Sequence, residues 1–131
     1  MAKSCASAVL DAALQYLEDN VDRISVCEGQ PTTYEHATST KGTATGKSLA
    51  ISSTPTFTGP GAGDGGGSSR KTTVDEEAGM TVDASGDADH IALAKSGTTA
   101  LLYVTTCTLQ TLTAGNTVTA PSWDIEIGSP S

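Results

Sequence analysis

Apolar residues near the N-terminus recur with the spacing of one helix face. They lie three or four positions apart between residues 6 and 21, and mostly acidic or amide side chains fill the positions between them. This periodicity predicts an amphipathic helix over residues 4–21. Two destinations are open for its apolar face, which either packs on the domain's own sheet or contacts another subunit. The face consists of Val9, Leu10, Ala13, Leu14 and Leu17.

Further along the chain, apolar and polar residues alternate, which is the pattern of half-buried β-strands. The clearest segments are 23–28, 90–94, 100–109 and 123–127. Short strands at near-regular spacing, separated by Gly-containing turns, indicate an antiparallel sandwich or barrel. The predicted fold class is therefore mainly β, an antiparallel β-sandwich or barrel-like domain with one N-terminal amphipathic α-helix.

The segments without periodicity are interpreted as loops within one domain over residues 1–131. Residues 31–47 are rich in Thr and predict a long surface loop. Residues 59–69 are dominated by Gly, whose backbone freedom keeps a segment mobile unless something clamps it. The expected order is a helix over 4–21, first strands and a Thr-rich loop over 23–58, a Gly-rich excursion over 59–69 and a β meander over 70–128.

The composition leaves little material for a hydrophobic core. The chain has 9 Leu, 7 Val, 5 Ile and 1 Phe, 22 of its 131 residues. This is a share of about 17%, and a share below ~20% in a charged chain is typical of polypeptides that order poorly on their own. We therefore expect a folded domain with a thin core that takes part of its stability from a partner surface.

The charge balance excludes two classes of partner. The chain carries 15 acidic and 7 basic residues, for a net charge of −8. Nucleic-acid binding requires a basic face that displaces counterions from phosphates, and anionic membranes attract basic segments. We therefore expect no nucleic acid and no membrane as partner. The N-terminal segment does not have the pattern of a secretory signal, which favours assembly in a cytoplasm.

Two glycine-containing motifs suggest phosphate or dinucleotide binding, and both lack the required context. Residues 42–48, Gly-Thr-Ala-Thr-Gly-Lys-Ser, have three residues between the glycines where a phosphate-binding loop has four. Residues 61–66 fit Gly-x-Gly-x-x-Gly, but no strand pattern precedes them and no helix pattern follows. Neither motif predicts a cofactor site.

The titratable residues likewise form no catalytic or metal-binding pattern. His36 and His90 have no Cys or His at ligand spacing, so both are interpreted as solvated surface residues. Three aspartates near Gly86 lack the spacing of a calcium loop, and the carboxylates on either side of Ile125 are expected to solubilise a strand. We expect no metal, no cofactor and no catalytic residue. The three aspartates are Asp83, Asp87 and Asp89, and the two carboxylates are Asp124 and Glu126.

Three cysteines are too few and too scattered for a disulfide framework. In a reducing compartment they are expected to remain thiols, and Cys107 lacks the neighbouring base that activates a nucleophile. Oxidation after release from the cell is the condition under which they would link subunits. The candidates for such a link are Cys5, Cys27 and Cys107.

The order of strand and turn sequences is similar to that of one group of proteins. The segments that carry the likeness are 27–34 (CEGQPTTY), 59–70, 89–93 (DHIAL), 101–104 (LLYV), 112–118 (LTAGNTV) and 123–128 (WDIEIG). In these segments the chain resembles small structural proteins encoded in the morphogenesis regions of tailed bacteriophages, including head decoration (cement) proteins. The Gly59–Ser69 tract is richer in glycine than that pattern.

The resemblance implies a virion protein without enzyme activity. A decoration subunit binds the outer face of the capsid lattice and stabilises contacts between capsomers. Its expected partners are the major capsid protein and further copies of itself, as a dimer or trimer, and it is located on the capsid surface after assembly in the host cytoplasm. The alternative is a tail-, fibre- or receptor-associated β-rich binding module of the same virion.

Overall fold

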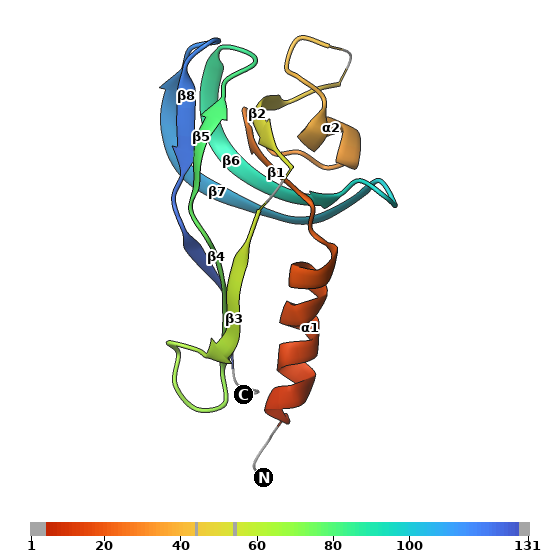
Figure 1. Ribbon diagram of the computed structural model, residues 1–131, viewed down its shortest axis with the longest axis vertical. Coiled ribbons are helices and arrows are strands. Elements are labelled where there is room, and N and C mark those ends of the chain that lie inside the picture. Colours follow the sequence, from red (N-terminus) through yellow and green to blue (C-terminus); the bar gives the residue numbers. More distant parts are fainter. Residues whose placement is uncertain (1–4, 44, 54, 129–131) are drawn as a thin grey trace. The chain divides into compact units, whose positions relative to one another are not determined.

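The computed structural model describes residues 5–43, 45–53 and 55–128 (Figure 1). The chain forms two compact units, each assembled from segments that lie far apart in the sequence. Unit 1 combines the described residues of 1–20, 56–76 and 122–131, and unit 2 those of 21–55 and 77–121.

Nine strands and two helices are found among the described residues, and every paired strand in the sheets runs antiparallel to its neighbour. The prediction of a mainly β antiparallel, sandwich-like fold with an N-terminal helix is confirmed. The elements are α1 (Ser7–Asn20), β1 (Arg23–Cys27), α2 (Tyr34–Thr38), β2 (Ser48–Ser52), β3 (Phe57–Ala62), β4 (Arg70–Val74), β5 (Glu77–Thr81), β6 (Gly86–Lys95), β7 (Ala100–Leu112), β8 (Thr117–Ala120) and β9 (Trp123–Ile127).

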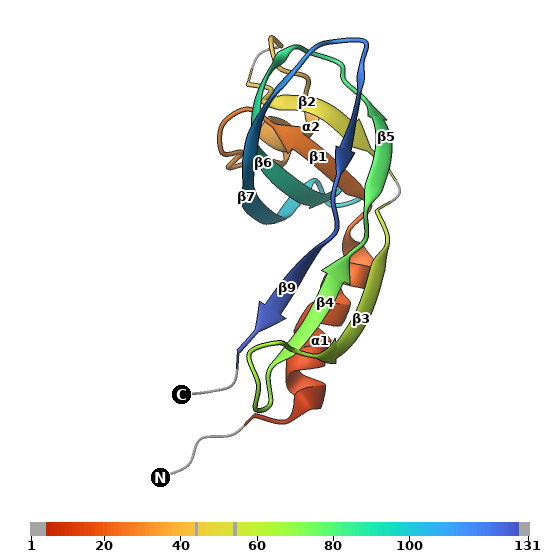
Figure 2. The ribbon, with the colours of Figure 1, turned by 90° about the vertical axis from the view of Figure 1, so that its left-hand side faces the viewer.

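Unit 1 is one helix on a three-stranded sheet. The strand order is β3-β4-β9, and α1 packs against β3 and β4 (Figure 2). Thr72 pairs with Ile125 and Val74 with Trp123, so these side chains share one sheet face. Ile125 is buried and Glu126 exposed, as the alternation of residues 123–127 predicts.

Unit 2 is built in layers around a four-stranded sheet of order β2-β1-β6-β7. The β5–β8 ribbon joins it through a bridge between Ala50 and Val82. Val26 and Ile91 on the sheet line one pocket together with Val118 on β8, so these side chains face one another across the two layers. Helix α2 contacts β1 and β2.

The expected Thr-rich loop over residues 31–47 contains α2, which the sequence did not predict. Thr33 is its N-cap, and the Thr33 Oγ1 accepts a hydrogen bond from the His36 N–H at 3.1 Å. A five-residue helix is too short to show a 3.6-residue period, so only the capping residue signals it.

The expected β meander over residues 70–128 is wrong in its pairing. β4 pairs with β3 and β9, and β5 pairs with β8. Within residues 70–128, β6 and β7 are the two strands that follow each other in the sequence and also pair with each other. The glycine at residue 79 does not form a turn between strands but lies within β5, where it has a φ of +70° beside a register shift. A glycine in a bulge accepts such a backbone without ending the strand.

The expected Gly-rich excursion over residues 59–69 begins as part of β3 and continues as a loop that hydrogen bonds to β4 and β9 hold in place. β3 extends to Ala62, and the Gly65 N–H donates to Glu126 Oε1 at 2.7 Å. Lys71 Nζ donates to Asp64 Oδ1 at 3.0 Å. The carboxylate on β9 and the ammonium on β4 therefore clamp a segment whose composition alone predicts mobility.

Candidate interaction surfaces

The structure divides the predicted apolar face of α1 between the inside and the outside of unit 1. Leu10 and Leu14 are 9% and 1% exposed, and Leu17 is half-buried. Val9 is 62% exposed, and Ala13 is also exposed. The predicted face is therefore partly core and partly surface.

Two acidic side chains explain this orientation of the helix. Asp11 accepts two hydrogen bonds from Arg70, at 2.7 and 3.1 Å, and Glu18 Oε1 accepts one from Thr72 Oγ1 at 3.0 Å. These contacts draw the acidic edge of α1 toward β4. The opposite edge turns outward and exposes Tyr16 to 55%.

We name the exposed apolar stripe Val9, Ala13 and Tyr16 the outer face of α1. The three residues are spaced i, i+4 and i+7, so they lie along one side of the helix. Exposed aromatic and aliphatic side chains grouped in this way are typical of a surface that binds a partner. The sequence pattern identified Val9 and Ala13 and missed Tyr16, because it assigned the acidic positions to solvent.

The Asp11–Arg70 contact should contribute measurably to the stability of unit 1. It is bidentate and partly covered, with side chains 31% and 24% exposed, so we expect the two substitutions to show a favourable coupling free energy rather than independent effects. Denaturant unfolding of Asp11→Ala, Arg70→Ala and the double variant measures it. Strictly additive losses would contradict the contact.

A Cys, a His and an Asp come together at the end of β1, which the sequence did not predict. Cys27 pairs with His90 across the β1–β6 ladder. The Asp89 Oδ1 lies 2.8 Å from His90 Nδ1 and accepts the Gly29 N–H at 2.8 Å. These hydrogen bonds, that from His90 first, lower the pKa of Asp89.

This arrangement is not a nucleophilic site. The Cys27 side chain is fully buried, and burial raises the pKa of its thiol to about 11. The sulfur therefore stays protonated at neutral pH, whereas a catalytic cysteine needs a lowered pKa and access to substrate. The expectation that His90 is solvated is wrong, because its side chain is 17% exposed and bound to Asp89.

The buried thiol predicts a loss of stability in alkaline solution. The unfolded thiol ionises near its usual pKa of 9.0, while the folded thiol ionises near 11. Stability is therefore complete below pH 9 and falls as the pH rises toward 11, by about 2–3 kcal/mol in total. Unfolding of the wild-type chain and Cys27→Ala across this range measures it, and two parallel curves would contradict it.

The remaining candidate residues do not converge on a site. Asp87 accepts a hydrogen bond from Thr111 Oγ1 at 2.9 Å, whereas Asp83 is exposed. His36 is half-buried, with its Nδ1 3.0 Å from Thr32 Oγ1. Within the residues that the structure describes, no three His, Cys, Asp or Glu side chains gather as metal ligands would.

All three cysteines are free thiols. Cys5 and Cys107 are partly exposed, and the predicted link between subunits stays a prediction for these two. Cys27 is inaccessible in the folded chain, which leaves it out of such a link.

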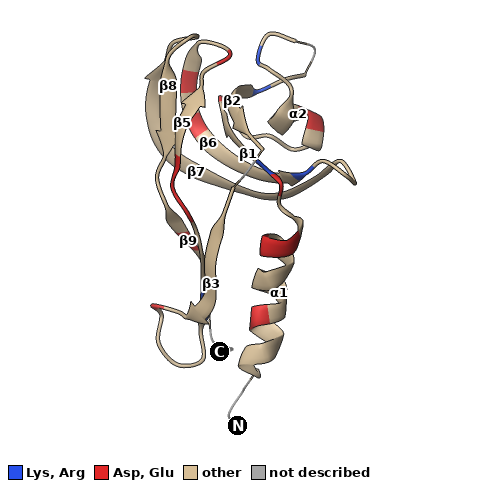
Figure 3. Cartoon of the chain, viewed as in Figure 1, with Lys and Arg blue, Asp and Glu red and all other residues tan. Residues whose placement is uncertain are grey.

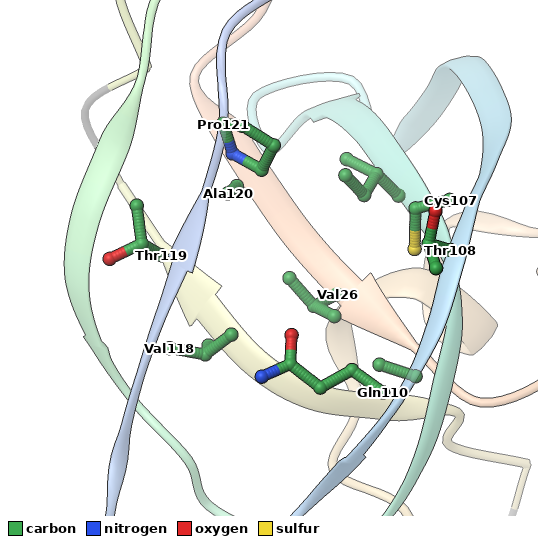
Figure 4. Close-up of a pocket in the computed structure, with 10 residues that line it drawn as sticks. Val26, Cys107, Thr108, Gln110, Val118, Thr119, Ala120 and Pro121 are labelled. Atoms are coloured by element: carbon green, nitrogen blue, oxygen red, sulfur yellow. The ribbon is translucent and has the colours of Figure 1, made fainter.

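Unit 2 contains a small pocket between β7 and β8, the strands on either side of the Ala114–Asn116 turn. Its volume is about 170 Å³. Figure 4 shows Val26, Gln110 and Val118 pointing toward one another in it. Its lining is mainly apolar, and Cys107 contributes its thiol, whose pKa is raised by burial. We name this cavity the β7–β8 pocket.

No family model, curated protein or solved structure matches the chain. No helix in the described part of the chain has both the length and the hydropathy needed to cross a bilayer.

Proposed function

We propose that this chain is a non-enzymatic structural subunit of a tailed-phage virion. It binds the outer face of the capsid lattice as a decoration, or cement, protein and stabilises contacts between capsomers. Its partners are the major capsid protein and further copies of itself. The sequence resemblance supplies the class of virion protein, and the outer face of α1 is the single structural observation that carries the proposal.

The outer face of α1 suits attachment to a repeating surface. Val9 and Tyr16 are 62% and 55% exposed on a helix whose opposite side already packs on β4. Complete burial of a large apolar side chain contributes about 1.5–3 kcal/mol before the entropic cost of association. One such contact is weak. A subunit that joins several neighbours gains from each of them, because later contacts form within an existing complex.

The charge of the chain is consistent with a place outside the shell. A net charge of −8 gives no attraction to packaged nucleic acid. A thin core is acceptable in such a subunit, since binding of the folded state raises its apparent stability.

The number of copies per particle tests this proposal. Purified virions of the phage that encodes the chain are digested, and the chain is quantified by mass spectrometry against the major capsid protein. Several hundred copies per virion are the expected result. A few copies or a few tens would indicate the tail, fibre or receptor-associated module instead, and absence from the particle would refute both.

A further inference from the structure

We propose that the edge strand β7 is the surface through which a second copy of this chain binds, by pairing with β7 of that copy, with Leu109 as an exposed apolar contact. The proposal rests on the proposed function, because it names the surface for the self-association of a decoration subunit. It concerns unit 2 alone.

β7 is an open sheet edge in the described structure. It is 13 residues long and the last strand of the order β2-β1-β6-β7, paired with β6 on one side. Two register shifts interrupt the β6–β7 ladder and leave Tyr103–Thr106 regularly paired between them. An edge strand offers unpaired backbone N–H and C=O groups to another chain, and proteins usually block it with charged side chains. β7 has none.

The absence of charge extends well beyond β7 in the sequence. Residues 96–123 contain no Asp, Glu, Lys, Arg or His, although the chain has 15 acidic and 7 basic residues. Figure 3 shows β7 free of charged residues along its length, while acidic positions appear on β6. Two copies with a net charge of −8 repel each other over most surfaces, and this uncharged edge is where they approach without direct repulsion.

The same strand carries one large, exposed apolar side chain. Leu109 is 62% exposed and is not among the residues that line the β7–β8 pocket. Its neighbours Thr108 and Gln110 do line that pocket, so the Leu109 side chain is directed away from it and toward solvent.

Two copies of the chain bring identical edges to such a contact. In a two-fold dimer the β7 strands of the two copies lie side by side, and their unpaired N–H and C=O groups bond to each other. Neither copy brings a charged side chain to this edge, so the pairing buries no unpaired charge. A charged partner surface gains nothing from an uncharged edge, whereas a second copy brings a matching uncharged strand. The edge therefore favours a second copy over an unrelated protein.

Two matched substitutions test this inference in the full-length chain. Leu109→Asp and Val9→Asp replace aliphatic side chains of equal exposure, 62% each, and add the same charge. Sedimentation velocity over a range of protein concentrations measures the dimer dissociation constant. We expect the wild-type chain to dimerise, Leu109→Asp to weaken the dimer about 100-fold, and Val9→Asp to leave it unchanged.

A second readout follows the β7 edge itself. Cys107 lies on β7 and is partly exposed, while Cys5 lies in unit 1 and is also partly exposed. Alkylation by N-ethylmaleimide should become slower at Cys107, and not at Cys5, as the wild-type concentration rises. The Leu109→Asp variant should lose this protection.

The outcomes separate this inference from the proposed function. A wild-type chain that stays monomeric, or a dimer weakened by Val9→Asp and not by Leu109→Asp, overturns the β7 interface. Neither result bears on the shell contact, because dimerisation is measured without capsids. Conversely, a β7 dimer that does not bind capsids leaves this inference in place and overturns the proposed function.

Discussion

Replacing Val9 and Tyr16 by aspartate is expected to weaken binding of the chain to its capsid about 100-fold or more. Both side chains stand on the outer face of α1, 62% and 55% exposed, so the substitutions do not disturb the core of unit 1. Two buried apolar side chains contribute about 3–6 kcal/mol, and 1.4 kcal/mol corresponds to a tenfold change in affinity. Cosedimentation of the purified variant with capsids that lack the chain measures the loss.

A control on the same helix separates lost apolar contact from added charge. Ala8→Asp and Gln15→Glu also add two negative charges, at exposed positions outside the outer face of α1. This pair should reduce binding far less than Val9→Asp with Tyr16→Asp. An equal loss in both pairs would mean that the charge alone repels the shell. Unchanged binding of the Val9 and Tyr16 variant would show that this face is not used.

The largest effect on folding is expected from Gly46→Ala, with a loss of about 3 kcal/mol in the free energy of unfolding. A Cβ at residue 46 would overlap the backbone carbonyls of Ser39 and Thr40. These carbonyls belong to a tight segment in which Ser48 N–H donates to Ser39 O at 3.1 Å. Backbone atoms held in this way move only if the hydrogen bonds around them break.

Gly61→Ala is the matched control for this substitution. A Cβ at residue 61 meets nothing within 4 Å, and Gly61 is not among the glycines with positive φ. The free energy of unfolding should change little, because neither space nor backbone conformation opposes the methyl group. Chemical unfolding followed by circular dichroism compares the two variants. Equal stabilities would contradict the close approach at Gly46.

The role of Gly46 also explains why residues 42–48 resemble a phosphate-binding loop without forming one. Gly46 is required where the chain passes close to carbonyl oxygens, which repel an anion. A phosphate loop needs its glycines so that N–H groups can surround the phosphate. Composition is similar in the two cases, and only the direction of the backbone groups distinguishes them.

Local pattern was sufficient to predict the class of fold and most strands. Alternation identified β1, β7 and β9 within a few residues. In β9 it corresponds to one covered and one exposed face, whereas in β1 the polar Ser25 is buried like its apolar neighbours. The pairing of β4 with β9 and of β5 with β8 could not be predicted in the same way. These strands lie far apart in the sequence, and alternation contains no information about the partner of a strand.

The orientation of α1 could not be predicted from the sequence. Periodicity placed Leu10 and Leu14 correctly in an apolar face and assumed that acidic residues point to solvent. Asp11 and Glu18 instead bind Arg70 and Thr72 on a strand whose position was unknown from the sequence. The orientation of α1, and with it the exposure of Tyr16, depends on these tertiary contacts. The β7–β8 pocket depends on tertiary packing in the same way.

Electron microscopy of the intact virion at side-chain resolution locates the chain on the particle. We expect ordered density for this chain at repeated positions on the outer surface of the head, with Val9 and Tyr16 of α1 buried against the major capsid protein. Density for the chain confined to the tail, or no density for it on the head, would refute the proposed attachment to the shell.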